Sequence, residues 1–413
     1  MKSIAYVTTT FPTFAAFLEN EVARFHARGV KLRVYTLRPT RRNYQPDHER
    51  LVPLVRYVGS PLDPRAWLDL LAWTLRRPHV MIPGFARILW ASRGSVYAIA
   101  GHLFWLPAAA RVATLAEQEG FDRIHGAWAH FPASVAWLAS RLTGRRFSMA
   151  GHAGSDLYRT QAFLKEKVRD ADFTTTCVRG NRDMLRKLAG NGPRIEWLYH
   201  GVDRARFDGQ GRARQPEPLF LCIGRLAETK GFDTAIRAMG ELKKRGLTPR
   251  LDMIGDGPDR LELEALAREQ GVADQVAFRG WVAQTELLPL YRRAWLLVAP
   301  SRVLANGRRD GITNVIVEAL AMGLPCAGTR AAGLEEAITE GVNGVLAPPD
   351  DAVALAAAIE PLLRDPARID RMSEAARTRI LGEFDADRNF ERLWSLFESD
   401  GAGAEAAPEA VSA

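Results

Sequence analysis

The chain has 413 residues, of which 47% are hydrophobic and 25% are charged, and its formal net charge is +8. These shares are close to those of soluble globular proteins, so they exclude a wholly disordered, collagenous or coiled-coil chain, and the length predicts two or three domains. The three cysteines, Cys177, Cys222 and Cys326, are single and widely spaced, so we expect no zinc ligand pair and no disulfide framework, but buried thiols in a reducing compartment.

Charge is distributed unequally along the chain. Residues 1–200 hold 29 Lys and Arg against 15 Asp and Glu, a net charge of +14, whereas the remainder holds 27 against 33, a net charge of −6. This asymmetry indicates two domains with different partners. An anionic membrane surface or a phosphate-bearing substrate would suit the basic half. We expect no nucleic-acid partner, because the arginines are scattered through helix-like segments.

The chain begins without a recognisable signal peptide, since Met1–Val7 carries one charge and continues directly into a strand pattern. The longest uncharged segment, Gly94–Ala110, contains Gly101 and Pro107 and is shorter than the ~20 apolar residues of a membrane span. We therefore expect a buried or interfacial helix there. The predicted location is the cytoplasm, with peripheral contact to the inner face of the membrane as a further hypothesis.

Short apolar segments alternate with longer helical patterns in the first half of the chain. A helix is expected at Phe17–Arg28, where apolar residues recur at helical spacing. The expected strands are Ile4–Thr8, Lys31–Thr36, Arg123–His125, Phe147–Ala150, Phe173–Cys177 and Ile195–Tyr199. This alternation is typical of parallel sheets covered by helices on both faces.

The same pattern restarts after a polar segment rich in Gly and Pro. The second series of expected strands is Leu219–Gly224, Arg250–Gly255, Val276–Phe278, Leu296–Pro300, Pro325–Gly328 and Gly344–Leu346. We predict an α/β protein with two Rossmann-like, doubly wound domains that face each other across a cleft, which is the default ligand site. The predicted divisions are a first domain at 1–202, a linker at 203–217, a second domain at 218–383, a C-terminal helix at 384–399 that returns toward the first domain, and a disordered tail at 400–413.

The segment from Gly224 to Gly231 is a candidate anion site, because it lies between a predicted strand and a predicted helix. Arg225 and Lys230 would stand at the carboxyl edge of the sheet beside a helix N-terminus, whose free N–H groups attract anions. Two fixed cations there would neutralise a diphosphate. The alternative interpretation is a solvated turn with ordinary surface charges.

A second candidate lies between Asp310 and Gly323. We expect a helix that begins near Thr313, is capped by Thr313 or a neighbour, and ends at Gly323. Glu318 would then lie on an otherwise apolar surface, where an unpaired carboxylate is costly. Its partner would be either ligand hydroxyl groups or a nearby arginine.

These segments, taken in order, resemble the family 4 glycosyltransferases. The resemblance covers nearly the full chain and is weakest at about 60–115. In the second half it is carried by Gly-Arg-Leu at 224–226 with Lys230-Gly231, by Gly255-Asp256-Gly257-Pro258, by Phe278–Val282, and by Asp310 and Glu318 followed by Ala-Leu-Ala-Met-Gly-Leu-Pro. In the first half, Phe11-Pro12, Ala129-His130-Phe131, Gly151-His152, Asp156-Leu157-Tyr158 and His200-Gly201-Val202-Asp203 resemble the bacterial exopolysaccharide branch, which includes the colanic-acid transferases.

The resemblance implies a GT-B fold and transfer of a hexose from a nucleotide diphosphate sugar, with retention at the anomeric carbon. It implies that Arg225 and Lys230 hold the diphosphate, that Glu318 binds the ribose, and that Asp310 binds hydroxyls of the donor sugar. The donor site would also include Gly224, Gly255, the backbone of Val282, and the amides of Gly311, Ile312, Thr313 and Asn314. His152 would lie near the reacting centre, and Phe11, Pro12, His130 and Asp156 would lie on the acceptor side.

The implied donor is a nucleotide sugar, most simply a UDP-sugar, and the implied acceptor is a glycan or a polyprenyl-diphosphate-linked sugar. No cofactor or metal is expected. Two Asp-x-Asp patterns, at Asp170 and Asp385, fall in helix-like charged stretches and are interpreted as structural. The alternatives are a nucleotide-sugar epimerase of the same fold and a non-catalytic protein that binds a nucleotide sugar.

Tryptophan and arginine residues alternate between positions 65 and 105, and this region has two interpretations. The tryptophans are Trp67, Trp73, Trp90 and Trp105, and the arginines are Arg65, Arg76, Arg77, Arg87 and Arg93. They are either core aromatics beside long basic side chains or a helical surface that lies on anionic lipid. His125 and His130, which flank a predicted strand end, likewise have a structural interpretation as polar residues of the sheet edge.

Overall fold

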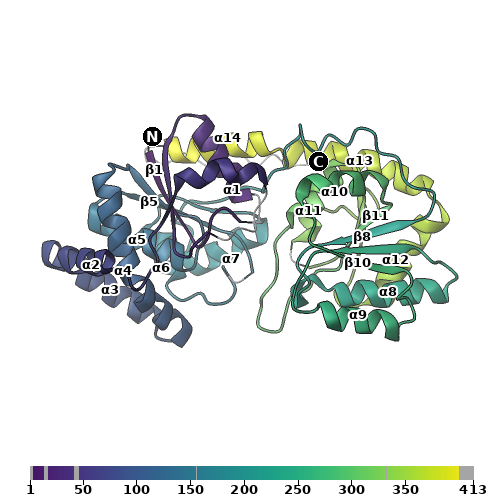
Figure 1. Cartoon of the computed structure of the whole chain (residues 1–413), viewed down its shortest axis with the longest axis horizontal. Coiled ribbons are helices and arrows are strands. Elements are labelled where there is room, and N and C mark those ends of the chain that lie inside the picture. The colour runs from purple at the N-terminus through teal and green to yellow at the C-terminus, as the bar shows by residue number, and fades with distance from the viewer. Residues whose placement is uncertain (1–2, 14–16, 41–45, 155, 332, 400–413) are drawn as a thin grey trace.

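The computed structural model describes residues 3–13, 17–40, 46–154, 156–331 and 333–399. It consists of two lobes, each built on a parallel sheet with helices on both faces (Figure 1). The expected fold class is therefore confirmed. The predicted tail, 400–413, lies outside the described residues.

The first lobe has a seven-stranded sheet in which all neighbouring strands are parallel. In spatial order its strands are β3 (Val55–Tyr57), β2 (Lys31–Thr36), β1 (Ser3–Thr8), β4 (Arg123–Gly126), β5 (Arg146–Gly151), β6 (Thr174–Thr176) and β7 (Ile195–Trp197). Its helices are α1 (Phe17–Ala27), α2 (Pro64–Arg76), α3 (Pro78–Ser92), α4 (Val96–Gln118), α5 (Phe131–Thr143), α6 (Leu164–Asp170) and α7 (Arg179–Ala189), with a 3-10 segment at Pro46–Leu54.

The alternation of side chains along β1 divides the core of this lobe into two layers. Ala5 and Val7 belong to the cluster that includes α4 and α5. Ile4 and Tyr6 point to the opposite face, into the cluster that includes α1. Because both faces of the sheet are covered, β1 is buried along its whole length, as expected for a parallel strand.

The second lobe repeats this design with six parallel strands. In spatial order they are β10 (Val276–Gly280), β9 (Arg250–Ile254), β8 (Leu219–Ile223), β11 (Leu296–Ala299), β12 (Cys326–Thr329) and β13 (Gly344–Ala347). The helices are α8 (Phe232–Lys244), α9 (Arg260–Glu269), α10 (Gln284–Arg293), α11 (Asn314–Ala321), α12 (Ala352–Arg364) and α13 (Ala367–Glu383), with 3-10 turns at Glu228–Lys230 and Leu334–Glu336.

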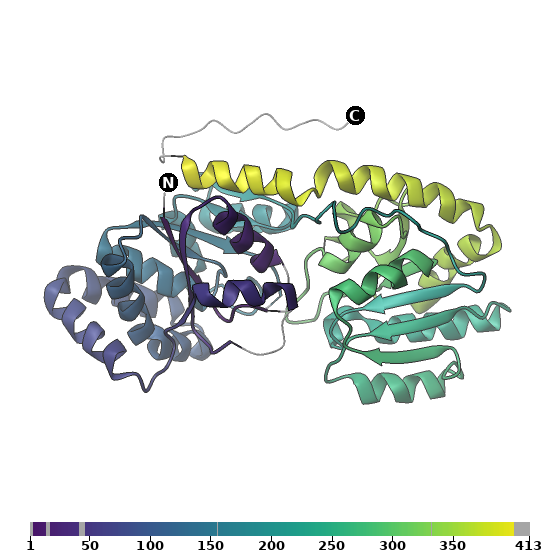
Figure 2. The same cartoon turned by 45° about the horizontal axis from the view of Figure 1, so that its top comes forward.

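The last helix, α14 (Ala386–Glu398), lies against the first lobe, although α13 before it packs on the second (Figure 2). Phe390 and Phe397 of α14 each lie 5.0 Å from the ring of Phe25 on α1. The chain therefore passes between the lobes twice, and its two connecting segments lie side by side around Gly201 and Ala386. A Cβ on Gly201 would lie 2.2 Å from the Cα of Ala386. Glycine at this position allows the two segments to touch.

The predicted strands all form, with ends that differ by one or two residues. One local prediction is wrong: Thr313 occupies the position before the first turn of α11, but its side chain makes no capping hydrogen bond. All three cysteines are free and buried, as expected. The domain limits given above remain a prediction.

Candidate active site

The turn after β8 places Lys230 at the carboxyl edge of the second sheet. Gly224 follows the strand with a φ of +150°, and a Cβ there would lie 3.3 Å from Cε of Lys230. Gly231 has a φ of +63°, and a Cβ on it would lie only 2.0 Å from the carbonyl oxygen of Pro300. The two glycines thus let the turn fold back on itself and pack against the end of β11.

Lys230 meets Asp310, as the two predicted site segments require. The Nζ atom of Lys230 lies 3.1 Å from Oδ2 of Asp310, and the two side chains are 17% and 26% exposed. The angles between the two groups do not make a hydrogen bond, so Oδ2 of Asp310 is a buried acceptor without a hydrogen-bonding partner in the described chain. The pair thus provides a fixed cation together with an acceptor that a ligand hydroxyl would satisfy.

Arg225, the other predicted cation, is exposed at the same turn. Within the described residues its side chain has no hydrogen bond or ion pair. It is therefore available to an anionic ligand, whereas the charge of Lys230 is already balanced by Asp310.

The loop after Asp310 leads to α11, whose first turn lacks a side-chain cap. The uncapped amides around Gly311, Ile312, Thr313 and Asn314 are candidates for anion binding, because helix N-termini carry unsatisfied N–H groups and partial positive charge. Gly311 also lies close to the first lobe, since a Cβ on it would be 3.4 Å from Sγ of Cys177.

Glu318 is buried on α11 and lines a pocket between the lobes. Its Oε1 accepts a hydrogen bond from Nε2 of Gln284 at 2.5 Å, and its Oε2 accepts one from the hydroxyl of Tyr291 at 2.9 Å. Burial raises the pKa of Glu318 above its usual value. The sequence analysis expected either ligand hydroxyls or an arginine as the partner of Glu318. The structure adds a third kind of partner, because two neutral side chains of α10 donate hydrogen bonds to the carboxylate.

The other two predicted donor residues lie at neighbouring strand ends. Gly255 follows β9, and a Cβ on it would lie 1.9 Å from the carbonyl oxygen of Gly224, so glycine is required for the ends of β8 and β9 to meet. Val282 follows β10 and is half-buried. Both residues are thus at the same sheet edge as the Gly224–Gly231 turn.

In the first lobe, Asp156 joins the loops that follow β4 and β5. Its Oδ2 accepts the backbone N–H of His152 at 2.8 Å, and its Oδ1 lies 3.0 Å from both the backbone nitrogen and Nδ1 of His130. The structure therefore brings together three of the predicted first-lobe residues. Phe11 and Pro12 are buried, and the ring of Phe11 lies in the core next to α1.

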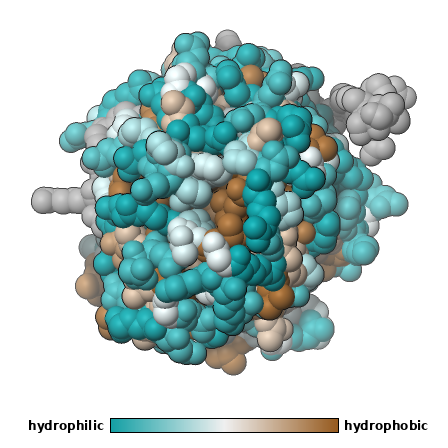
Figure 3. Space-filling model, turned by 90° about the vertical axis from the view of Figure 1, so that its right-hand side faces the viewer, coloured by the Kyte–Doolittle hydropathy of each residue, from teal (hydrophilic) through white to brown (hydrophobic). Residues whose placement is uncertain are grey.

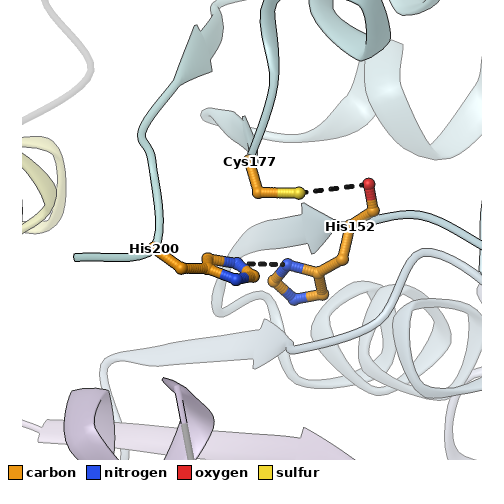
Figure 4. Close-up of side chains that lie close together, drawn as sticks. All are labelled: His152, Cys177 and His200. Atoms are coloured by element: carbon orange, nitrogen blue, oxygen red, sulfur yellow. Dashed lines mark hydrogen bonds between the residues drawn. The ribbon is translucent and has the colours of Figure 1, made fainter. Parts of the chain in front are cut away.

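His152 is paired with a second histidine, His200 (Figure 4). Its Nε2 lies 3.0 Å from the carbonyl oxygen of Ala127, so this nitrogen carries the proton, and Nδ1 then accepts from Nε2 of His200 at 3.1 Å. Burial lowers the pKa of both histidines, so both rings are neutral at pH 7. The ring of Phe17 stacks on His200 at 3.9 Å.

The ligand atoms of His152, His200 and Cys177 lie within 4.8 Å of one another, which is a spacing that a metal ion would tolerate. These candidate ligand atoms already make hydrogen bonds, however. The two histidines are hydrogen-bonded to each other, and the thiol of Cys177 donates to the carbonyl oxygen of His152 at 3.3 Å. Burial raises the pKa of Cys177 to about 12, so the thiolate that a metal requires is disfavoured. We interpret the cluster as a hydrogen-bonded unit.

The two lobes touch beside this unit. The N–H of Gly154 donates to the carbonyl oxygen of Arg309 at 2.7 Å, and the guanidinium of Arg309 lies 4.2 Å from the ring of Tyr158. His200 is also hydrogen-bonded to the side chain of Asn314. The Asp310 loop is therefore held against the loop that carries His152 and Asp156.

Three contributors to the site were not predicted from the sequence. Gln284 and Tyr291 are seven residues apart on one face of α10. Two polar residues at this spacing beside apolar positions could have indicated that they lie inside the protein and bind a polar partner. His200 was noted only as part of a motif, because its contacts with His152 and Asn314 depend on the fold.

The chain is similar to known proteins in sequence and in fold. The family model described as "Glycosyl transferases group 1" matches residues 203–379. The glycogen synthase of Mycobacterium tuberculosis is 30% identical over 349 residues, which cover 82% of this chain and 79% of that protein. The amylovoran biosynthesis glycosyltransferase AmsK of Erwinia amylovora is 31% identical over 199 residues, which cover 48% of this chain and 49% of that one. The structure of HepE from Anabaena in complex with UDP and glucose matches 97% of this chain and all of that chain, with a TM-score of 0.72 and 18% identity.

The two facing Rossmann-like lobes have the GT-B fold, and the sequence matches are to glycosyltransferases. The chain belongs to the group 1 glycosyltransferases.

Proposed function

We propose that the protein is a family 4 enzyme that transfers a hexose, with retention at the anomeric carbon, from a nucleotide diphosphate sugar to a glycan or polyprenyl-diphosphate-linked acceptor of a surface polysaccharide. The observation that carries this proposal is the meeting of Lys230 and Asp310 at 3.1 Å beside the uncapped first turn of α11. A UDP-sugar is the proposed donor, and the structure of HepE with UDP and glucose supports that choice.

The charges of the second lobe suit the leaving group. Cleavage of the sugar–phosphate bond develops negative charge on the diphosphate. Lys230 and the amides at the start of α11 are held at one edge, and the exposed Arg225 is available there to the same anion. Because Lys230 and the amides already hold their positions, they stabilise the transition state more than the ground state. They supply the positive charge without a metal ion, and we propose a metal-independent reaction.

Glu318 and Asp310 would hold hydroxyl groups on either side of the diphosphate. Each carboxylate oxygen has more than one acceptor position, so Glu318 retains acceptor capacity beside Gln284 and Tyr291 for the ribose hydroxyls. The Oδ2 atom of Asp310, which is ion-paired with Lys230 but accepts no hydrogen bond, would accept one from a hydroxyl of the donor sugar.

In the first lobe, His152 would stand next to the reacting centre as a neutral ring, with His130 and Asp156 on the acceptor side. Neither nitrogen of His152 is a free base in this arrangement, because one donates to Ala127 and the other accepts from His200. We therefore propose that the leaving phosphate takes the acceptor's proton and that no side chain acts as the base. The enzyme would work in the cytoplasm, with a membrane as a candidate partner.

The proposal is tested by the release of nucleotide diphosphate from a panel of UDP-, GDP- and ADP-sugars with and without candidate acceptors. Lys230→Ala is expected to lower kcat by ~10²–10³, because it removes a cation that opposes the developing charge. Lys244→Ala, at the exposed end of α8, is the matched control and should keep full activity.

Other results of the same assay would contradict the proposal. Tight donor binding with no turnover on any acceptor would identify a binding protein, and recovery of an epimeric nucleotide sugar would identify an epimerase. An inverted anomeric centre in the product, determined by NMR, would reject retention while leaving glycosyl transfer intact.

A further inference from the structure

The exposed apolar side chains of the molecule are concentrated on one helical insert, residues 62–118, which lies between β3 and β4. Of the seventeen large hydrophobic side chains that are exposed in the described chain, eleven lie between residues 62 and 104. Four of them are more than two-thirds exposed: Leu62 (89%), Leu75 (73%), Trp90 (70%) and Val96 (84%). By contrast, the outer end of the second lobe is mostly hydrophilic (Figure 3). Solvent-facing helices normally present polar residues, so this concentration requires a partner.

Within each helix of the insert the exposed apolar residues form a stripe. On α2, Ala66 and Trp73 face the core, and the exposed residues at i, i+1, i+4 and i+8 lie on the other side at 100° per residue. These four residues are Trp67, Leu68, Leu71 and Leu75. Exposed apolar residues also recur at helical spacing on α3, at i and i+8, and on α4, at i, i+1, i+7 and i+8. They are Ile82 and Trp90 on α3 and Val96, Tyr97, Leu103 and Phe104 on α4. We call these ten residues the apolar insert face.

The charges of the insert favour an anionic partner. Its three acidic residues are all engaged: Asp63 accepts the N–H of Arg65 and caps α2, Asp69 pairs with Arg111 at 2.9 Å, and Glu117 pairs with Arg76 at 2.6 Å. Arg65, Arg77 and Arg93 have no acidic partner among the described residues of the chain. Net positive charge beside an apolar surface suits an anionic lipid surface better than a neutral or basic protein.

The two exposed tryptophans have the contacts expected at a membrane interface. The indole N–H of Trp67 donates to the carbonyl oxygen of Pro61 at 2.9 Å, and the guanidinium of Arg93 lies 4.3 Å from the ring of Trp90. Trp67 thus combines an exposed apolar ring with a satisfied N–H group, and Trp90 combines an exposed ring with a cation held against it. Trp73 is buried and Trp105 is half-buried, so the sequence-based alternative of core aromatics holds for these two.

The insert rests on the lobe surface and does not cross a membrane. Among the described helices, α4 alone is long and apolar enough to span one by length and composition, and half of its most apolar window is buried. Ala108–Ala116 belongs to the core layer against α5. Insertion of the whole helix would therefore strip the first sheet of its cover.

The apolar insert face adjoins the acceptor side of the proposed active site. The ring of Tyr97 lies 3.8 Å from the guanidinium of Arg159, which belongs to the loop that carries Asp156. One turn further, His102 lies 2.9 Å from Oγ of Ser134, whose hydroxyl donates to the carbonyl oxygen of His130. A surface docked on α4 would thus meet the loops of His130 and Asp156.

We infer that the apolar insert face docks the enzyme on an anionic lipid bilayer, with the stripes of α2–α4 among the lipid headgroups and with Arg65, Arg77 and Arg93 on lipid phosphates. Its relevance to the acceptor rests on the proposed function: an acceptor carried by a lipid would then be presented to the first lobe at His130 and Asp156.

Sedimentation with phosphatidylcholine vesicles, with and without phosphatidylglycerol, tests this inference on the full chain. The wild type should bind the anionic vesicles at low salt, several-fold less at high salt, and least without phosphatidylglycerol. The exposed double variant Leu68→Asp/Leu71→Asp should reduce binding at least tenfold. Leu261→Asp, at a still more exposed leucine of α9 in the other lobe, should leave vesicle binding unchanged. Arg65→Glu/Arg93→Glu should abolish the preference for anionic lipid, whereas Arg268→Glu on α9 should keep it.

Absence of wild-type binding at low salt, or unchanged binding by the leucine double variant, would overturn the inference. Light scattering without lipid tests whether a second copy of the chain covers the apolar insert face instead. A dimeric wild type, a monomeric leucine double variant and no vesicle binding would together show a contact between two copies of the chain. Thermal shift with the donor separates this result from the proposed function. The insert variants should show the same nucleotide-sugar-induced thermal shift as the wild type. If the wild type binds vesicles but turns over no nucleotide sugar, the proposed function alone is rejected.

Discussion

Glu318 and His125 are both buried, but their polar atoms are satisfied to different extents. Both oxygens of Glu318 accept hydrogen bonds from α10. In His125, Nδ1 lies 2.9 Å from Oγ of Ser148, while Nε2 is buried without a partner in the described chain. The sequence predicted that Glu318 lies on an otherwise apolar surface and that His125 lies at the end of a strand. It did not predict their partners, because Gln284 and Ser148 approach them only after the strands and helices have packed.

Tyr291→Phe should destabilise the protein, since it leaves Oε2 of Glu318 buried without its donor. The expected loss is about 1–3 kcal/mol of unfolding free energy, measured by urea denaturation. Affinity for the nucleotide sugar should fall as well, because the Glu318 carboxylate loses one of the two hydrogen bonds that hold it. Tyr57→Phe on the exposed edge strand is the control and should change neither quantity. A Tyr291→Phe protein as stable as the wild type would show that Tyr291 does not hold Glu318 in solution.

Stability should fall in acid because of His125. Burial lowers its pKa to about 3, so between pH 6.5 and 3 the unfolded chain binds a proton that the folded chain does not. This difference costs about 1.4 kcal/mol per pH unit below pH 6.5. His102 has the same low pKa for the same reason. Burial also lowers the pKa of His152 and His200, so these two histidines add to the same slope. His125→Phe should therefore remove only its own part of the acid slope, measured as urea midpoints at pH 7, 5.5 and 4.5, and His79→Phe at an exposed position of α3 is the control.

At the scale of elements, the turn between β8 and α8 could be predicted from the sequence, because its residues are close together along the chain. Gly224, Arg225, Lys230 and Gly231 are close in sequence, so the expected strand and helix fixed their common edge. The uncapped start of α11 was not readable. Thr313 has the residue type of a cap, and its φ of −77° and ψ of 143° suit one, but its side chain makes no capping bond. Residue type alone does not determine where a hydroxyl points.

Gly231→Ala should be much more damaging than another glycine substitution with a similar backbone. A Cβ at Gly231 would overlap the carbonyl oxygen of Pro300, whereas Gly29, with a φ of +70°, has nothing within 4 Å of the corresponding position. Gly29→Ala should therefore show only the cost of the left-handed conformation, about 1 kcal/mol. Gly231→Ala should lose more stability and should also lower kcat, since the turn positions Lys230. Equal losses in the two variants would mean that the turn moves away from β11 at little cost.

At the scale of the whole molecule, contacts between the lobes join residues that are far apart in sequence. Glu336 of the second lobe accepts the backbone N–H groups of Arg179 and Gly180 at the start of α7, at 2.9 and 3.3 Å, and the hydroxyl of Tyr199 at 2.9 Å. The two-lobed fold was predictable from the repeated strand–helix alternation. These contacts were not, because no local pattern marks Glu336 as a cap for a helix in the other lobe.

Glu336→Ala should loosen the lobes in the absence of ligand. Three donors lose their acceptor, so we expect a larger radius of gyration by small-angle X-ray scattering and a weaker donor affinity. Saturating donor should reduce the difference in radius, because a ligand that bridges the lobes favours the closed arrangement. Glu335→Ala, at the exposed neighbouring position, should match the wild type. Identical scattering of the two variants would show that Glu336 does not hold the lobes together.

The return of α14 to the first lobe has a consequence for synthesis on the ribosome. The apolar side of α1 around Phe25 is covered by Phe390 and Phe397, which are translated last. At 5–20 residues per second, the nascent first lobe waits on the order of 10–40 s for that cover after β7 has emerged. Throughout this interval a band of aromatic rings faces water. A chain arrested before residue 386 should therefore be a stronger client of cellular chaperones than the finished enzyme.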